Sequence, residues 1–417
     1  MIMAMIRPET EMKDSGVEWI GDIPTNWRRS KLKYLGEYIN GYAFKPADWS
    51  SKGHQIIRIQ DLTGSNSGEP NYFDGILDEK YHVVNGDILV SWAATLDAFV
   101  WKKEDGWLNQ HIFKAVPNEK IVKGYFLWLL KVAMDNMNND DKHGIVMQHV
   151  TIGLFNNYVV PLAPYTEQQA IADYLDKTCS KIDEIIAEAK ASINEYEKLK
   201  QATIDENMFG YDSVHIKLRQ LGSLKNGLNF SHSDDVANIK FLGVGCFKDN
   251  MILSKVDDFA DEHIDFEISE EYLLSNGDIV FVRSNGSKEL VGRSIMVENI
   301  DYPVTFSGFC IRFRNMHTEL VDNRFLLYYF RTTHFKQSLL KYSNDSTNIN
   351  NLNQEMLNAI YINAPVINEQ KLLVKKLEKQ VFVIDSLISE KEFLINDLEA
   401  YKKSLIYEVV TGKRRVV

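Results

Sequence analysis

The sequence is poor in cysteine and proline, with three and nine of these residues among 417. The cysteines lie far apart and form neither a metal-ligand spacing nor a disulfide framework, so we expect a reduced, cytoplasmic protein. Long hydrophobic runs are also missing. The densest of them, residues 125–134, contains Lys131 and is too short to cross a bilayer, so the sequence predicts no membrane-spanning helix.

Motifs of several enzyme classes are missing as well. The sequence has no Asn-Pro-Pro-aromatic motif with a glycine-rich cofactor loop, as a DNA amino-methyltransferase needs, and no Gly-x4-Gly-Lys-Ser/Thr phosphate loop. The ten histidines show no metal-ligand spacing. Asp78-Glu79-Lys80 comes nearest to a nuclease site but lacks a second carboxylate on a strand, and we interpret it as a solvated loop. We therefore expect a non-catalytic chain that holds no cofactor or metal of its own.

An excess of positive charge is absent too. The chain has 47 Lys and Arg residues against 58 Asp and Glu residues, a net charge of −11. Such a chain is not a polycation that wraps nucleic acid. Any contact with DNA must therefore come from local basic or polar patches.

What the sequence does contain is an internal duplication. Residues 167–210 align without a gap to residues 369–412, at a constant offset of 202. Fifteen of the 44 aligned positions are identical, namely Glu167, Gln168, Leu175, Lys177, Ile182, Asp183, Ile186, Glu188, Ile193, Asn194, Glu197, Lys200, Ile204, Glu206 and Gly210. This level of identity indicates a repeat rather than two unrelated helices.

Both copies predict a long helix. Their apolar residues recur at steps of three and four, the spacing typical of a coiled coil. Thr166 and Asn368 are predicted to cap the first turns, and Gly210 and Gly412 to follow the helix ends. A generic dimerising coiled coil would show the same spacing, but the duplication extends well beyond the helices.

The segments before each helix are also duplicated. Gly86-Asp-Ile-Leu89 parallels Gly277-Asp-Ile-Val280, and residues 32–44 parallel residues 218–230. Within these segments, short strands bounded by glycine and asparagine precede one helix, which indicates an α+β unit. The predicted strands and helices include residues 55–60, 87–92 and 279–283 as strands, and 123–134 and 322–331 as helices.

The predicted fold class is therefore α+β, with two similar heads joined by two long antiparallel helices in an approximately two-fold arrangement. Antiparallel packing brings the C-terminus close to the first head, where an N-terminal segment could dock through Trp19, Ile20, Ile23 and Trp27. The predicted divisions are an N-terminal docking segment (1–27), a first head (28–165), a central spacer helix (166–212), a second head (213–365), and a C-terminal spacer helix with its tail (366–417).

Four features together carry a family resemblance. They are Ser15-Gly-Val-Glu-Trp-Ile-Gly-Asp-Ile-Pro-Thr-Asn-Trp27, a proline followed twice by Glu-Gln and a long helix, the two Gly-Asp-Ile strands, and the order head, helix, head, helix. On these features the whole chain resembles the DNA specificity subunit of type I restriction–modification enzymes. The resemblance implies two target recognition domains, each of which reads one half of a bipartite site in double-stranded DNA.

The resemblance also implies partners. They are two methyltransferase (M) subunits that dock on the helices and, in the full restriction complex, motor-nuclease (R) subunits. S-adenosylmethionine, ATP and Mg²⁺ would be bound by these partners, and no membrane is involved. A non-catalytic coiled-coil scaffold with two protein-binding heads is the alternative, which the acidic first helix favours slightly.

Candidate DNA contacts in the second head follow its Gly-Asp-Ile strand. Arginine can bond in bidentate fashion to guanine, and the resemblance implies that this loop lies near DNA. A tight, solvent-exposed hairpin is the alternative interpretation. The candidate residues are Arg283, Ser284, Asn285, Ser287, Lys288 and Arg293.

The first head has different residues at the corresponding place. Trp92 takes the position of Arg283, so we expect this head to read another half-site. Gln110 and His111 are candidates for base contact or, equally, for hydrogen bonds at a strand end. The remaining candidates are Ser91 and Thr95 beside Trp92, with Lys45 in the first head and His232 in the second as phosphate contacts.

Overall fold

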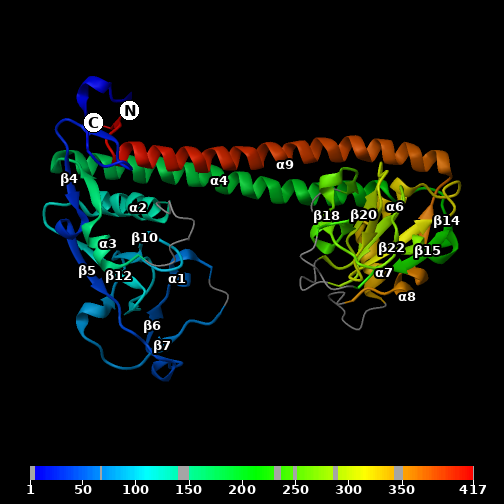
Figure 1. The fold of residues 1–417 in the computed structure, drawn as a ribbon, viewed down its shortest axis with the longest axis horizontal. Helices are drawn as coiled ribbons and strands as arrows, with labels where there is room; N and C mark the ends of the chain where they lie inside the picture. The colour runs from blue at the N-terminus through cyan, green and yellow to red at the C-terminus, as the bar shows by residue number, and fades with distance from the viewer. Residues whose placement is uncertain are drawn as a thin grey trace. The chain divides into compact units, whose positions relative to one another are not determined.

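Two long helices run through much of the chain in Figure 1, α4 (Tyr165–Asn207) and α9 (Ile367–Val410). The computed structural model describes residues 5–65, 68–139, 150–229, 236–247, 251–284, 290–341 and 351–416. The chain divides into two compact units, which we call unit 1 (Met1–Ala189 with Leu394–Val417) and unit 2 (Lys190–Phe393). Both helices therefore contribute residues to both units.

The two helices begin slightly earlier than the sequence predicts. The carbonyl oxygen of Pro164 accepts hydrogen bonds from the backbone N–H groups of Glu167 and Gln168, and Val366 plays the same part for α9. Thr166 and Asn368 consequently lie inside the first turns, so their prediction as N-caps is wrong. Gly210 and Gly412 follow the helix ends with φ angles of 95° and 77°, the left-handed conformation that glycine favours.

Within each unit the two helix segments are antiparallel. In unit 1, Lys402 Nζ of α9 lies 2.6 Å from Asp183 Oδ1 of α4. In unit 2, Lys200 Nζ of α4 lies 2.6 Å from Asp385 Oδ1 of α9. The two ion pairs use the same two positions of the sequence repeat, because Asp183 matches Asp385 and Lys200 matches Lys402 at the offset of 202. The duplicated residues thus fix the same helix register in both units.

Unit 1 contains two four-stranded sheets. In one, neighbouring strands are antiparallel in the order β10-β9-β12-β5; in the other, β6 and β11 are parallel in the order β7-β6-β11-β8. Helix α2 packs against β10. The strands are β5 (Gly36–Asn40), β6 (His54–Ile57), β7 (Tyr72–Phe73), β8 (His82–Val83), β9 (Ile88–Ser91), β10 (Asp97–Val100), β11 (Gly106–Leu108) and β12 (Ile112–Pro117). The helices are α1 (Ile59–Thr63), α2 (Lys123–Asn139) and α3 (Ile152–Asn157).

Unit 2 repeats this plan. Its larger sheet has the order β15-β22-β19-β20-β17, which reproduces β5-β12-β9-β10 and adds one strand. Its smaller sheet has the order β18-β16-β21 and again contains one parallel pair, β16 with β21. The strands are β15 (Gly222–Asn226), β16 (Ile239–Leu242), β17 (Ile252–Leu253), β18 (Ala260–Glu262), β19 (Ile279–Val282), β20 (Ser294–Val297), β21 (Val304–Phe306) and β22 (Cys310–Asn315). The helices are α5 (Leu218–Leu221), α6 (Asn323–Tyr329), α7 (Thr333–Leu340) and α8 (Gln354–Ala359).

Short two-stranded pairs complete the frame. In both units one such pair joins the entry to a head with the strand that leads into a long helix: β4 (Arg28–Lys31) with β13 (Val159–Leu162), and β14 (Val214–Lys217) with β23 (Tyr361–Ala364). In unit 1 the N-terminal segment adds β2 (Met12–Asp14) with β3 (Asp22–Pro24), and β1 (Met5–Ile6) pairs with β24 (Arg414–Arg415). The two ends of the chain therefore lie together in unit 1.

The aspartate of each Gly-Asp-Ile motif ties a turn to a neighbouring strand. The Asp87 carboxylate accepts a hydrogen bond from the Val84 backbone N–H and lies 2.8 Å from Lys114 Nζ on β12. Asp278 accepts from the Ser275 backbone N–H and receives two hydrogen bonds from Arg314 on β22, at 2.8 and 2.7 Å. The preceding Gly86 and Gly277 have φ angles of 94° and 89°, which only glycine adopts readily. This motif is therefore a structural element of both heads.

The duplicated glutamine of each long helix attaches that helix to its head. Gln168 is buried, accepts a hydrogen bond from the Val122 backbone N–H and donates one to the Ala163 carbonyl oxygen. Gln370 does the same in unit 2. Its partners are the Asp322 N–H and the carbonyl oxygens of Leu320 and Pro365. A buried side-chain amide with both ends satisfied fixes where the helix leaves the head.

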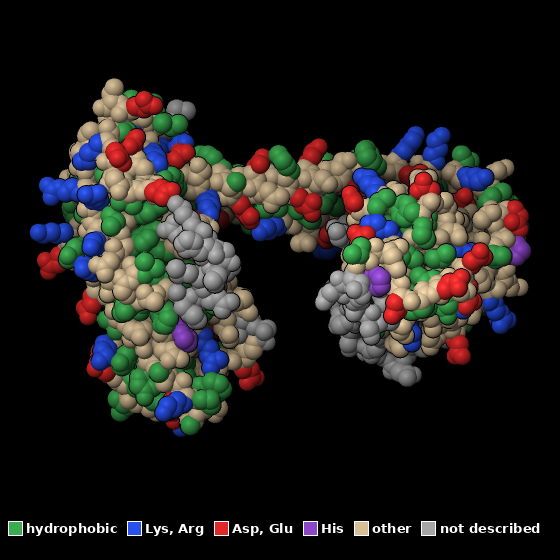
Figure 2. Space-filling model, viewed as in Figure 1, with side chains coloured by type: hydrophobic (Ala, Val, Ile, Leu, Met, Phe, Trp, Pro, Cys, Tyr) green, Lys and Arg blue, Asp and Glu red, His purple; other side chains and the backbone are tan. Residues whose placement is uncertain are grey.

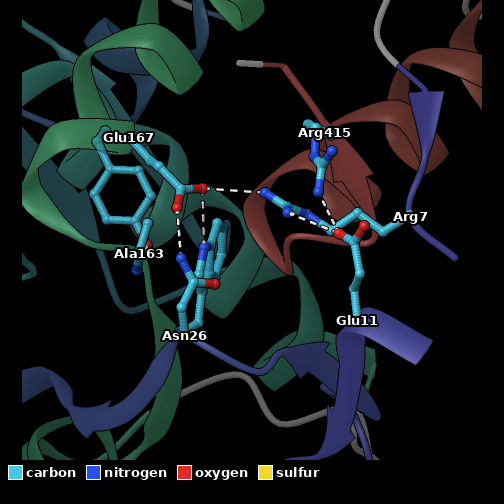
Figure 3. A network of polar contacts seen from close by, with 8 residues as sticks. Arg7, Glu11, Asn26, Ala163, Glu167 and Arg415 are labelled. Carbon is cyan, nitrogen blue, oxygen red and sulfur yellow. Dashed lines mark hydrogen bonds and ion pairs between the residues drawn. The ribbon is translucent and has the colours of Figure 1, made fainter. Parts of the chain in front are cut away.

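The adjacent glutamates, in contrast, differ between the units. The Glu167 carboxylate accepts hydrogen bonds from Arg7 (3.1 Å), Asn26 (2.9 Å) and the Trp27 indole (3.1 Å), as Figure 3 shows for Arg7 and Asn26. The indole of Trp27 is buried, as are Ile20 and Ile23 of the same segment, while Trp19 stacks on Tyr158. In unit 2 the matching Glu369 is exposed. The N-terminal segment thus holds the start of α4, and no described segment contacts Glu369 at the start of α9 in the same way.

Candidate functional site

In each unit, the residue after the Gly-Asp-Ile strand meets the turn between the next two strands. The Trp92 backbone N–H donates to the His111 carbonyl oxygen in unit 1, at 3.4 Å. The Arg283 N–H donates to the Phe309 carbonyl oxygen in unit 2, at 2.7 Å. Trp92 and Arg283 therefore occupy equivalent positions, and so do His111 and Phe309.

The turn in unit 2 is held firmly. Arg283 Nη1 donates to the Gly308 carbonyl oxygen at 3.3 Å, and the Phe309 N–H donates to the Ser307 hydroxyl at 3.2 Å. The Phe309 side chain is nevertheless 59% exposed. A hydrogen-bonded turn thus presents an apolar ring beside Arg283. The sequence does not predict this exposed ring, because an isolated phenylalanine in a strand-rich segment looks like a core residue.

The other unit 2 candidates are only partly brought together. Ser284 is half-buried next to Arg283, whereas Asn285, Ser287, Lys288 and His232 lie outside the described residues. Arg293 lines a cavity of 450 Å³ beside the segments of α4 and α9 in unit 2, together with Arg331, Lys200 and Asp385. A DNA contact by any of these residues stays a prediction.

At the matching strand end of unit 1, the candidates face different surroundings. Ser91 is fully buried and its hydroxyl donates to the Ala93 carbonyl oxygen. The Trp92 ring stacks on Phe113 with the ring centroids 5.7 Å apart. Thr95 and Lys45 are exposed. The polar groups of unit 1 therefore have to be sought beyond this strand end.

They gather around a pocket of 280 Å³ in unit 1. The pocket lies where the parallel strands β6 and β11 end, because Ile57 pairs with Leu108 and the chain then continues into Arg58 on one side and Asn109 on the other. This volume is just below the range of about 300–1,000 Å³ typical of small-molecule sites. The residues that give the pocket its polar and aromatic character are Phe44, Trp49, Arg58, Gln60, Asn109, Gln110 and His111.

Arg58 is placed by a local helix start. The sequence predicts a strand over residues 55–60, but β6 ends at Ile57. The Asp61 carboxylate accepts a hydrogen bond from the Arg58 N–H at 2.8 Å, and this contact begins α1. The Arg58 guanidinium carbon then lies 4.8 Å from the centroid of the Trp49 ring. This cation–π contact holds the guanidinium plane over the aromatic ring.

Gln110 and His111 complete the polar side of the pocket. Gln110 Nε2 lies 3.3 Å from His111 Nε2, and the Gln110 N–H donates to the Asn109 side chain at 2.7 Å. Among the described residues, no hydrogen-bond partner meets the buried Nδ1 of His111. The turn therefore offers a carboxamide and an imidazole whose hydrogen-bonding capacity is only partly used within the chain.

The described metal-ligating and nucleophilic side chains have the following surroundings. No group of three or more His, Cys, Asp or Glu side chains there is arranged to hold a metal ion. All three cysteines are buried and free, and burial raises the pKa of Cys179 to about 11, which leaves its thiol protonated. The exposed Asp78 pairs with Lys80 at 3.1 Å, and hydrogen bonding from the Lys80 backbone lowers the pKa of Asp78.

The face of the molecule in Figure 2 shows side chains of both charges. On the face in Figure 2, Lys and Arg side chains alternate with Asp and Glu over both units. No helix in the described ranges is both long enough and apolar enough to cross a membrane. The net charge of −11 likewise does not favour a general electrostatic attraction to a polyanion.

Comparison with known proteins points to one family. The family model described as "Type I restriction modification DNA specificity domain" matches twice, at residues 24–195 and 212–392. The specificity subunit of the type I restriction enzyme MjaVIII of Methanocaldococcus jannaschii is 26% identical over 94% of this chain and 94% of its own length. The EcoBI specificity subunit of Escherichia coli is 22% identical over 97% of this chain and 89% of its own length.

A solved structure shares the fold. It comes from work on complex assembly and conformational transition of the type I R-M system, and its matching chain is 13% identical. The alignment covers 94% of this chain and 99% of that chain, with a TM-score of 0.70. At this identity the likeness concerns the fold.

Proposed function

Because the chain belongs to the family of type I restriction–modification DNA specificity subunits, it recognises DNA sequence, and we propose that units 1 and 2 each read one half of a split site. One observation carries this proposal. The same frame is built twice, with the same turn beside the same strand end, yet the side chains at that turn are Trp92 and His111 in one unit and Arg283 and Phe309 in the other. Two similar readers with different contact residues suit two different half-sites.

The long helices supply the remaining part of the proposal. Leu372, Phe382 and Phe393 of α9 are 69%, 72% and 67% exposed, although Leu377, Val381 and Ile384 of the same helix are buried. Large exposed apolar side chains on a helix mark surfaces that bind other proteins. We therefore assign α4 and α9 two roles, as the spacer between the two readers and as the surface on which two methyltransferase subunits dock.

The chemistry then belongs to the partners. Methyl transfer from S-adenosylmethionine is assigned to the methyltransferase subunits, and ATP- and Mg²⁺-dependent translocation and cleavage to the motor-nuclease subunits. The chain itself selects the site and holds no catalytic residue. It acts in the cytoplasm, where DNA and these partners meet.

Sequencing of modified bases in single DNA molecules tests this function. Cells that contain the chain and its methyltransferase subunits are expected to carry methylated adenine in a motif of two short halves separated by a gap of unspecified bases. The control is the same strain without the gene for this chain, in which that motif should be unmodified. A single uninterrupted methylated motif would refute the two-reader proposal.

A further inference from the structure

The described residues of unit 2 contain no polar counterpart of the pocket beside Arg58, although the frame around it is the same. Ile57 pairs with Leu108 in unit 1, and Leu242 pairs with Phe306 in unit 2, so that Arg58 and Gly243 follow equivalent strand ends. The hydrogen bonds of the adjacent turn extend the match to His111 and Phe309. The equivalent positions therefore carry Arg58, Gln60, Gln110 and His111 in unit 1 and Gly243, Gly245, Gly308 and Phe309 in unit 2.

Packing does not impose every one of these differences. A Cβ atom placed on Gly245 would meet no atom within 4 Å, so the frame leaves room there for a side chain such as that of Gln60. Three positions around this one pocket have hydrogen-bonding side chains in unit 1 and glycines in unit 2. They are Arg58, Gln60 and Gln110, whereas the motif residues that build the frame are the same in both units. These differences lie at the same pocket as the buried Nδ1 of His111, which has no hydrogen-bond partner among the described residues, and this points to a binding role for that surface.

The side chains that line the pocket indicate which kind of ligand it binds. Among the described residues that line it, one arginine and three carboxamides accompany a histidine, and there is neither a lysine nor a carboxylate. A carboxamide offers a donor and an acceptor at the spacing of an adenine edge, and a guanidinium matches the two acceptors of guanine. A surface that only neutralises phosphate would instead carry several lysines or arginines.

We propose that Arg58 and Gln60, with Gln110 and His111, form the base-reading site of unit 1, and that Arg58 discriminates one base pair of its half-site. The ring of Trp49 fixes the Arg58 guanidinium before DNA binds, which lowers the entropy cost of a bidentate contact. Phe309 takes the place of His111 in unit 2 and makes an apolar contact to a base there, because a thymine methyl group is the complementary surface in the major groove. This inference rests on the proposed function of two separate readers.

The test uses the full chain in complex with its methyltransferase subunits. Binding is measured for a set of DNA duplexes, each of which differs from the recognised site at one base pair. Arg58→Ala is expected to reduce discrimination at one base pair of one half-site by about tenfold to a hundredfold and to leave the other half-site unchanged. Arg58→Lys should not restore it, because an ammonium group lacks the planar fork of the guanidinium.

Matched variants show whether the loss of discrimination is specific to the pocket and to one half-site. Arg28→Ala removes an exposed arginine of β4 outside the pocket and should leave discrimination unchanged. Gln60→Ala changes an exposed side chain and should weaken discrimination in the same half-site as Arg58→Ala. Arg283→Ala in unit 2 should relax a position in the other half-site.

Three results would overturn the inference. One is equal loss of affinity for all duplexes with Arg58→Ala, the mark of a phosphate contact. Another is unchanged discrimination with both Arg58→Ala and Gln60→Ala. The last is a relaxed position in the half-site that Arg283→Ala also affects. Failure of the two-reader function itself would look different, because the unaltered complex would then recognise a site without a gap.

Discussion

Units 1 and 2 keep the contacts that build the frame and change the side chains that face outward from it. Asp87 and Asp278 hold the same turn, and Gln168 and Gln370 attach the long helices in the same way. The polar positions Arg58, Gln60, Gln110 and His111 around the pocket of unit 1 carry different residues at their equivalents in unit 2. The comparison separates the contacts that both units share from the side chains in which they differ, without recourse to other sequences.

A second difference concerns how each unit is closed. In unit 2 the chain passes directly from the end of α4 into β14 through residues 208–213. In unit 1 the end of α9 is instead joined to the entry of the head by contacts between the two chain ends, which include the β1–β24 pair and the ion pair of Arg415 with Glu11 in Figure 3. Non-covalent closure has to be stabilised by side chains that covalent closure does not need.

The largest effect should come from the buried aspartate of the Gly-Asp-Ile motif. Asp278 is 1% exposed, and Asp278→Ala removes the carboxylate that accepts from the Ser275 N–H and from Arg314, which keeps its bond to the Leu273 carbonyl oxygen. We therefore expect a loss of about 3–5 kcal/mol in the free energy of unfolding of unit 2. Asp87→Ala should cost unit 1 less, about 1–3 kcal/mol, because the side chains of Asp87 and Lys114 are each 17% exposed and water can replace part of the interaction.

Hydrogen exchange followed by mass spectrometry measures the two losses separately, since peptides of each unit report their own opening. Equal losses, or a larger loss with Asp87→Ala, would show that burial does not distinguish the two motifs.

A smaller effect should distinguish the glutamates that precede the buried glutamines. Glu167→Ala removes the acceptor of Arg7, Asn26 and Trp27, and we expect unit 1 to lose about 2–3 kcal/mol, because the Arg7 side chain is only 8% exposed. Glu369→Ala is the matched control. No described side chain bonds to this exposed carboxylate, so the change should stay within about 0.5 kcal/mol.

Thermal unfolding of both variants, with hydrogen exchange of residues 5–27 as a local probe, measures this difference. The exchange of that segment should accelerate only with Glu167→Ala. If Glu369→Ala were equally damaging, the start of α9 would need a stabilising contact of its own, and the contrast in closure would be wrong.

The sequence predicted the frame well because its evidence is local. The period of apolar residues gave the two long helices, and family matches confirm the specificity-subunit fold. Thr166 and Asn368 were predicted as N-caps because their side chains suit that position. In the structure, the carbonyl oxygens of Pro164 and Val366 accept the first hydrogen bonds, so each helix begins before these residues.

The site was harder to predict for a physical reason. Arg58 and Gln110 are 52 positions apart and meet only because β6 and β11 pair in parallel, which no local pattern announces. One local signal was available. Asp61 stands three residues after Arg58, the spacing of a capping box, and it would have ended the predicted strand at Ile57. Phe309 carried no such signal, because its exposure depends on the turn that Ser307 and Arg283 hold.

The most direct test of two independent readers exchanges one head and leaves the other in place. Residues 28–163 are replaced by the corresponding segment of a relative with a different recognition sequence, and the methylated bases of the host genome are sequenced. The account predicts a split motif in which one half has a new sequence, while the other half and the base methylated in it are unchanged. A motif in which both halves change together would contradict it.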